Sequence, residues 1–176
     1  IRQLSREELR QQFGMVLQDA WLFEGTIKDN LRFGNVNATD DEIVEAGKAA
    51  NVDHFIRTLP GGYDMKMNQE SSNISLGQKQ LLTIARALIS DPKILILDEA
   101  TSSVDTRLEQ LIQKAMSRLM EGRTSFVIAH RLSTIQEADK ILVMDNGQII
   151  EQGNHETLLE QKGFYYELYQ SQFTKD

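Results

Sequence analysis

The chain has 176 residues, which is about the size of one domain with a single hydrophobic core. Its formal net charge of -7 at pH 7 argues against a dedicated nucleic-acid-binding protein, because neutralising phosphates requires clustered Lys and Arg. The sequence contains no cysteine, which excludes disulfides and thiolate metal sites and suits a reducing cytoplasm. Its apolar runs are much shorter than the roughly 20 residues of a membrane span, and its beginning, IRQLSREELRQQ, does not resemble a signal peptide. Because the sequence opens on a polar segment without Met, we expect it to have been cut from a longer protein.

The first half of the sequence predicts one short strand followed by helices. FGMVLQ, residues 13–18, has the apolar character of a strand, and residues 27–32 favour a short helix. Thr39 precedes three acidic residues and is a typical N-cap, so we expect a helix to follow it. Ser75 lies at the start of a longer helix, whose apolar stripe consists of Leu81, Ile84, Ala85 and Leu88.

The second half alternates strands with helices. We expect strands in ILIL, TSFVIA and the two arms of ILVMDNGQIIEQG, with a helix at residues 107–120 between the first two. This alternation is typical of α/β proteins in which a largely parallel sheet is covered by helices on both faces. The tail, residues 155–173, favours two short helices.

Two adjacent acids, Asp98 and Glu99, stand at the end of the strand ILIL. The carboxyl ends of parallel strands open on the crevice in which α/β proteins bind ligands, so both carboxylates can reach a bound metal and its substrate. One acid can hold Mg²⁺ while the next deprotonates an attacking water. The alternative is that the pair only caps the turn that follows, and these two residues alone do not decide between the interpretations.

Other polar residues also fall at the ends of predicted elements. Ser75 and the backbone N–H groups around Gly77 lie at a helix start, where unpaired donors and the helix dipole favour a phosphate. His130 follows the strand TSFVIA and Gln18 ends FGMVLQ, so both are expected near the same crevice. Each has a simpler explanation, namely an ordinary serine cap beside a glycine, a structural histidine and a loop glutamine. Only their combination indicates a site.

Together these residues resemble the nucleotide-binding domain of an ATP-binding cassette (ABC) transporter of the exporter type, over essentially the whole chain. ISLGQ, residues 74–78, resembles the signature motif of that family, ILILDE its Walker B strand and SSVD, residues 102–105, its D-loop. Gln18 in VLQDAWLFEGTIKDNL matches the Q-loop, and His130 in IAHRLSTI matches the switch histidine.

The resemblance implies an α/β fold of the P-loop NTPase type, with a mostly parallel sheet and a helical subdomain. We expect one partial ATPase domain over residues 1–176, truncated at its N-terminus. Within it, residues 25–90 would form the helical subdomain with the signature motif. Residues 91–153 would form the core with Walker B, D-loop and switch histidine, and residues 154–176 the C-terminal helices.

The resemblance also implies ATP and Mg²⁺ as ligands and a role for each residue beside them. Glu99 would polarise the water that attacks the γ-phosphate, and His130 would hold that phosphate. Asp98 would coordinate Mg²⁺. Gln18 would contribute to the same metal site and link site closure to the membrane domain.

The remaining motif residues would act across a dimer of cassettes, either a homodimer or a heterodimer. Ser75, Gly77 and Gln78 would contact ATP bound to the second cassette, and Asp105 would lie at the interface between the two. The other implied partner is a transmembrane domain, upstream on the same chain, at the cytoplasmic face of the cell membrane. No nucleic-acid partner is expected.

The phosphate loop of this family is missing from the sequence. The motif G-x-x-x-x-G-K-[ST] needs Ser or Thr after a Gly-Lys pair, whereas the only such pair here, Gly47-Lys48, precedes Ala49. We therefore expect the phosphate cradle, the adenine-stacking aromatic and the strand that leads to the loop to lie upstream of Ile1. Without that strand, we expect ILIL and FVIA to lack a normal neighbour in the sheet.

Three functions compete at this point. The leading hypothesis is the ATPase cassette of an exporter, and the alternative is a non-catalytic fragment or module that supplies only the signature motif to a partner cassette. A chromosome-maintenance or repair ATPase shares the signature and Walker B motifs, but it inserts a long heptad coiled coil that this sequence lacks.

We also expect Trp21, Leu22 and Phe23 to dock on the membrane domain, with a local core under the helical subdomain as the other possibility.

Overall fold

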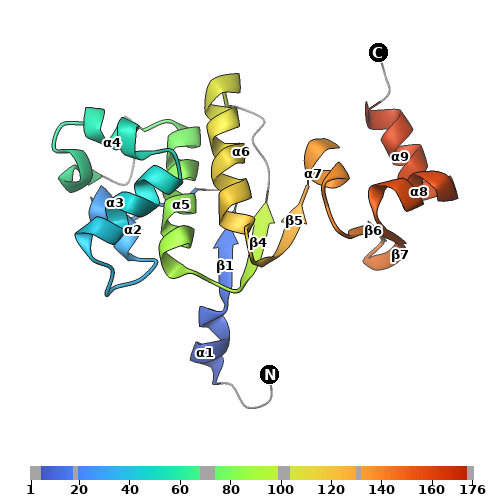
Figure 1. Cartoon of the computed structure of the whole chain (residues 1–176), viewed down its shortest axis with the longest axis horizontal. Helices are drawn as coiled ribbons and strands as arrows, with labels where there is room; N and C mark the ends of the chain where they lie inside the picture. Colours follow the sequence, from blue (N-terminus) through green and yellow to red (C-terminus); the bar gives the residue numbers. More distant parts are fainter. Residues whose placement is uncertain (1–4, 18–19, 68–73, 99–103, 130–131, 174–176) are drawn as a thin grey trace. The chain divides into compact units, whose positions relative to one another are not determined.

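The computed structural model describes residues 5–17, 20–67, 74–98, 104–129 and 132–173 (Figure 1). The chain divides into two compact units, unit 1 with residues 1–128 and unit 2 with residues 129–176. In the part of the chain that the structure describes, every helix is too short or too polar to span a bilayer.

Unit 1 combines helices with a small parallel sheet. Its elements are α1 (Arg6–Gln11), β1 (Phe13–Val16), β2 (Gly25–Thr26), α2 (Ile27–Arg32), α3 (Asp40–Ala49), α4 (Asp53–Thr58), the 3-10 helix η1 (Gly62–Asp64), β3 (Lys66–Met67), α5 (Leu76–Ser90), β4 (Ile94–Asp98), α6 (Thr106–Met120) and β5 (Thr124–Ile128).

The sheet of unit 1 has three parallel strands in the order β1-β4-β5. Leu95 at its centre pairs with Gly14 of β1 on one side and with Ser125 of β5 on the other. The prediction of parallel pairing is therefore confirmed. The prediction that the strand ILIL lacks a normal neighbour is wrong, because β1 and β5 both bond to β4.

The two faces of this sheet differ. Leu95 and Leu97 are fully buried on one face and share a core with Leu81 of α5 and Ile112 of α6. On the opposite face, the register places Met15 of β1 and Phe126 of β5 in one row with Ile96 of β4. Met15 is 57% exposed and Phe126 is 56% exposed. Within the described residues, helices cover only the first face, although the sequence predicted cover on both.

The helices begin where side chains satisfy free backbone N–H groups. Thr39 Oγ1 accepts a hydrogen bond from Glu42 N at 3.3 Å, and Glu42 Oε2 accepts one from Thr39 N at 2.7 Å, which closes a capping box at the start of α3. The same box occurs at Thr26 before α2 and at Ser75 before α5. The predicted N-cap at Thr39, the helix at residues 27–32 and the helix start at Ser75 are confirmed.

Unit 2 has a small core of its own. Its elements are α7 (Leu132–Gln136), β6 (Ile141–Asp145), β7 (Gln148–Gly153), α8 (His155–Gln161) and α9 (Phe164–Phe173). β6 and β7 form an antiparallel hairpin, and Asn146 and Gly147 between them have positive φ angles, as a tight hairpin turn requires. Val143, Leu158 and Tyr165 form the buried core of this unit. The predicted strand pair and the two tail helices are confirmed.

Candidate functional site

The candidate site residues that the structure describes are Ser75, Gly77, Gln78, Asp98 and Asp105. Gln18, Glu99 and His130, to which the sequence assigns the chemistry, lie outside the described residues.

Ser75 and Gln78 close the start of α5. Ser75 N donates to Gln78 Oε1 at 2.9 Å, and Gln78 N donates to Ser75 Oγ at 3.3 Å. Ser75 Oγ acts as an acceptor in this box, so its hydroxyl proton can still be donated to an anion. Because Ser75 is exposed, this donor lies at the surface of unit 1 beside the N–H groups of the first turn.

Gly77 lies one residue inside α5 and, unlike Ser75, is buried. Its Cα faces Leu108 in the first turn of α6 and Val104 just before that helix. Asp105 is the N-cap of α6, and its Oδ1 accepts a hydrogen bond from Leu108 N at 3.0 Å. The structure therefore brings the signature segment and the D-loop aspartate of the sequence prediction together at the adjoining starts of two helices.

Asp98 is the last residue of β4, where it pairs with Ile128 of β5 and is half-buried. A carboxylate oxygen is the kind of ligand that Mg²⁺ prefers, and Mg²⁺ usually needs only one or two carboxylates because it keeps several waters. Among the described residues, no group of three or more His, Cys, Asp or Glu side chains could hold a metal ion. Asp98 is thus compatible with Mg²⁺, as one ligand rather than as part of a full protein cage.

Sequence reasoning missed a polar pair that anchors the segment after Gln18, namely Asn30 and Arg86. Asn30 is fully buried, and its Oδ1 accepts a hydrogen bond from Phe23 N at 3.0 Å. Its Nδ2 donates to Phe23 O at 2.9 Å and to Thr26 O at 3.1 Å. The signal in the sequence was a polar residue beside Leu31 and three positions after Ile27, on the buried side of a short helix.

Arg86 of α5 continues this network. Its Nε donates to Asn30 O at 2.8 Å, its Nη2 to Asn30 Oδ1 at 3.0 Å and its Nη1 to Trp21 O at 3.1 Å. Its guanidinium carbon also lies 5.8 Å from the centre of the Phe23 ring and 5.6 Å from that of Phe33. Burial lowers the pKa of Arg86, but an arginine starts so high that the side chain stays protonated at neutral pH. We call Asn30 and Arg86 with these contacts the Asn30–Arg86 clamp.

The segment held by this clamp presents aromatic rings to solvent. Trp21 and Phe33 are each 64% exposed, and Phe23 lies between them with ring centres 5.9 Å and 5.4 Å away. Leu22, in contrast, packs against the main core of unit 1. Leu22 therefore has a packing role in unit 1, whereas the ring of Trp21 is left at the surface.

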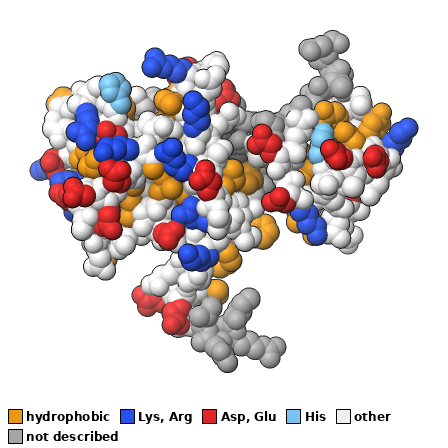
Figure 2. Space-filling model, in the orientation of Figure 1, with side chains coloured by type: hydrophobic (Ala, Val, Ile, Leu, Met, Phe, Trp, Pro, Cys, Tyr) orange, Lys and Arg blue, Asp and Glu red, His pale blue; other side chains and the backbone are white. Residues whose placement is uncertain are grey.

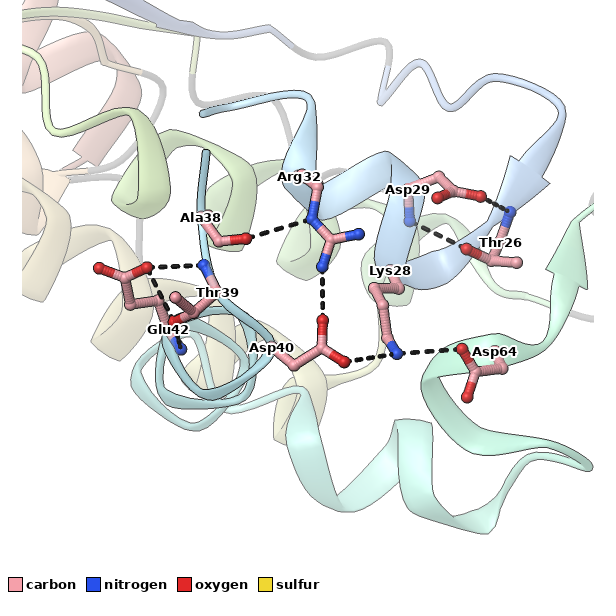
Figure 3. Close-up of polar contacts among 9 residues, drawn as sticks. All are labelled: Thr26, Lys28, Asp29, Arg32, Ala38, Thr39, Asp40, Glu42 and Asp64. Carbon is pink, nitrogen blue, oxygen red and sulfur yellow. Dashed lines mark hydrogen bonds and ion pairs between the residues drawn. The ribbon is translucent and has the colours of Figure 1, made fainter. Parts of the chain in front are cut away.

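Ion pairs fix α2 to its other neighbours (Figure 3). Lys28 Nζ lies 3.0 Å from Asp40 Oδ2 of α3 and 3.1 Å from Asp64 Oδ1 of η1, and Arg32 also pairs with Asp40. The hydrogen bond from Lys28, followed by that from Arg32, lowers the pKa of Asp40, and the bond to Asp40 raises the pKa of Lys28. Side chains of both signs are interspersed over this part of the surface (Figure 2). α2 is therefore held from several sides, with the Asn30–Arg86 clamp as its link to α5.

Comparisons with known proteins agree with the sequence resemblance. A family model described as "ABC transporter" matches residues 1–102. The chain is 57% identical over 175 residues to an uncharacterized ABC transporter ATP-binding protein, YfiC, of Bacillus subtilis. This alignment covers 99% of this chain and 29% of that protein. It is also 49% identical over 176 residues to an ATP-dependent lipid A-core flippase of Syntrophus aciditrophicus. This second alignment covers 100% of this chain and 29% of that protein.

A solved structure of a bacterial Atm1-family ABC exporter with ATP bound matches the fold with a TM-score of 0.88 at 41% sequence identity. The match covers 100% of this chain and 31% of that one. The chain thus spans less than a third of the length of the relatives it matches.

Proposed function

Because the chain belongs to the ABC transporter family, we propose that it forms part of the ATP-binding and ATP-hydrolysing cassette of an exporter. The observation that carries this proposal is the fold match over the whole chain to an exporter solved with ATP bound. The exporter type is further supported by the relative named as a flippase. The transported substrate is not part of the proposal, because substrate contacts lie in a membrane domain.

We assign the chemistry to Glu99, His130, Asp98 and Gln18, on the basis of the motifs in the sequence. Glu99 acts as the general base that accepts a proton from the attacking water, and His130 contacts the γ-phosphate. Asp98 and Gln18 hold Mg²⁺. When bound, this ion neutralises the charge of the β- and γ-phosphates.

The start of α5 is assigned to a nucleotide held by a second cassette. The hydroxyl of Ser75 and the first-turn N–H groups around Gly77 donate to phosphate oxygens there. Gln78 keeps Ser75 in place through the capping box, and the exposed Asp105 lies at the interface between the cassettes.

The aromatic segment is assigned to the membrane domain. Trp21 and Phe33 are large exposed residues that contact Arg86 of the Asn30–Arg86 clamp, and exposed apolar clusters often mark interfaces. We assign to this surface an amphipathic cytoplasmic helix of the membrane domain, so the cassette works at the cytoplasmic face of the membrane.

The test is the substitution Glu99→Gln in the longer transporter that carries this chain. The amide has nearly the same shape but cannot accept a proton, so steady-state ATP turnover should fall by roughly 10²–10⁴-fold while ATP binding persists. Glu160→Gln on the exposed surface of α8 is the matched control and should retain full turnover. A Glu99→Gln protein with half the original rate would show that Glu99 is not the base.

A second candidate function is a non-catalytic module that completes a partner's site through Ser75 and Gly77. The observation that favours it is the exposed Ser75 at the start of α5, where its hydroxyl can reach a ligand outside this chain. Gly47-Lys48, the sole Gly-Lys pair in the sequence, lies inside α3 rather than in a phosphate-binding loop. The 176-residue chain should therefore bind MgATP only weakly in a calorimetric titration, since the backbone cradle and lysine of a phosphate loop supply most contacts to the phosphates. The longer transporter distinguishes the two functions, because a module of this kind shows no turnover that depends on Glu99.

A further inference from the structure

Gly77 is crowded by the next helix rather than open to solvent. A methyl carbon placed on its Cα would lie 2.5 Å from Leu108 Cδ2 and 2.9 Å from both Leu108 Cγ and Val104 Cγ1. Distances below 3.0 Å are far inside van der Waals contact, so any larger residue at position 77 must push α5 and α6 apart or distort Leu108. The missing side chain of Gly77 therefore has a packing role within this chain.

Leu108 makes two contacts that belong to different motifs. Its side chain fills the space left by Gly77, which lies between the capping partners Ser75 and Gln78. Its backbone N–H donates to Asp105 Oδ1 at 3.0 Å. One residue thus connects the start of α5 with the aspartate that caps α6.

We propose that Gly77 and Leu108 form a steric joint that fixes the relative position of the α5 start and Asp105, which makes Leu108 a positioning residue for the nucleotide site. This inference rests on the proposed function for its catalytic consequence, but the joint itself is a property of this chain. Through the joint, Ser75 and Asp105 move as one body when they meet a nucleotide or a second cassette. Leu108 acts only through these neighbours.

The joint predicts that the effect of Gly77→Ala changes sign with the size of residue 108. Ala is a better helix former than Gly, so the substitution should stabilise an uncrowded helix. With Leu108 in place, overpacking outweighs this gain, and the melting temperature of the 176-residue chain should fall by roughly 2–8 °C. In a Leu108→Ala background two of the three close contacts are gone, and Val104 Cγ1 at 2.9 Å can shift into the space that Leu108 leaves. Gly77→Ala should then raise the melting temperature by about 1–3 °C.

The effect of the joint on catalysis is measured on the longer transporter, as the turnover number and the KM for ATP. Gly77→Ala should lower the turnover number on the order of 10- to 100-fold, because small displacements of groups at a reacting centre have effects of this size. Leu108→Ala added to it should restore at least half of the turnover that Leu108→Ala shows alone. If Gly77 were needed only for close approach of a nucleotide, the double variant would stay as slow as Gly77→Ala.

The pair Gly47 and Tyr63 provides the control for destabilisation alone. A methyl carbon on Gly47 would lie 2.2 Å from Tyr63 Oη, so Gly47→Ala should lower the melting temperature and Tyr63→Phe should relieve the clash. Both variants leave the contact between Gly77 and Leu108 intact and should keep the turnover number within about twofold, since the effects of substitutions that share no contact are largely independent.

Each outcome decides the proposal. The sign change in melting temperature together with rescued turnover supports it. A melting temperature that falls equally in both backgrounds refutes the joint, and a rescued melting temperature without rescued turnover refutes the positioning role. If Gly77→Ala alone gives no folded protein, recovery of folded protein by Leu108→Ala counts as the rescue. A wild-type transporter without ATPase activity contradicts the proposed function, while the melting series still tests the joint.

Discussion

Replacing Arg86 by Ala is the most informative single perturbation of unit 1. The substitution removes the hydrogen bonds to Asn30 O, Asn30 Oδ1 and Trp21 O and the contacts with the Phe23 and Phe33 rings. It leaves the α5 backbone unchanged and inserts a good helix former. What it tests is whether the clamp, rather than the apolar core alone, holds the segment after Gln18 on α5.

The expected loss of unfolding free energy in Arg86→Ala depends on how deeply each lost contact is buried. The two bonds to Asn30 are partly buried, and each contributes about 1–2 kcal/mol when the donor is charged. The bond to Trp21 O is exposed, so it and the two ring contacts add only about a few tenths of a kcal/mol each. Arg86→Ala should therefore lower the free energy of unfolding by about 3–5 kcal/mol. At a typical urea dependence of about 2 kcal/mol per molar, the midpoint shifts down by roughly 1.5–2.5 M.

The assay uses the fluorescence of Trp21, which is the single tryptophan of the chain and belongs to the segment in question. Urea unfolding followed by this signal reports unit 1. Arg86→Lys keeps one charge but loses the fork that reaches several acceptors, so it should give an intermediate midpoint. Lys48→Ala removes an exposed pair with Glu45 and serves as the control with little change. An Arg86→Ala midpoint within about 0.3 M of the wild type would refute the reasoning, because a shift that small corresponds to less than one ordinary hydrogen bond.

Three further perturbations test other parts of the chain. In unit 2, Gly163→Ala should weaken the docking of α9 and reduce the near-ultraviolet circular dichroism of the tyrosines, because its methyl carbon would lie 2.1 Å from Oε1 of Glu151. The two carboxylate oxygens of Glu151 accept hydrogen bonds from the first N–H groups of α9, Oε1 from Phe164 N and Oε2 from Tyr165 N. Arg57, through its hydrogen bond, lowers the pKa of Asp53, so this carboxylate adds stability above its ordinary pKa of about 4 that is lost as the pH falls through the lowered value. The difference in urea midpoint between wild type and Asp53→Asn should accordingly be largest at pH 6 and shrink as the pH falls below about 4, and a gap that does not change with pH would contradict this. Phe23→Ser in the longer transporter should uncouple ATP turnover from transport more than it lowers the melting temperature, and the reverse pattern would favour a purely local core at this residue.

Local signals in the sequence were sufficient for most of the helices and strands. The helix starts at Thr39 and Ser75 follow from a capping side chain and its partner three residues later, so both partners lie in one short window. The position of β4 in the sheet could not be obtained in this way. Pairing between β1 and β4 joins Phe13 to Ile94, and strand order of this kind depends on packing between distant segments rather than on local pattern.

The sequence motifs predicted which residues belong to the candidate site, but they did not predict which side chains contact one another. Arg86 and Asn30 are 56 positions apart, and neither residue type nor spacing indicates that they meet. The contact of Gly77 could not be predicted from the sequence either. A glycine at a helix start is equally consistent with a ligand close to the backbone and with a neighbouring helix in that space, and only the position of Leu108 shows that the second applies within this chain.

The two ends of α5 are therefore attached to different parts of unit 1. Near its C-terminal end, Arg86 holds the segment that exposes Trp21, and at its N-terminal end Gly77 is locked against Leu108. The helix has 15 residues, which corresponds to a length of about 22 Å, and Leu81, Leu82 and Ile84 in its middle are buried in the main core. A helix packed in this way is displaced as a whole, because close-packed interiors transmit strain rather than absorb it. We therefore expect a displacement of the segment around Trp21 to shift Ser75 and, through Leu108, Asp105. This would connect the proposed contact with a membrane domain to the start of α5.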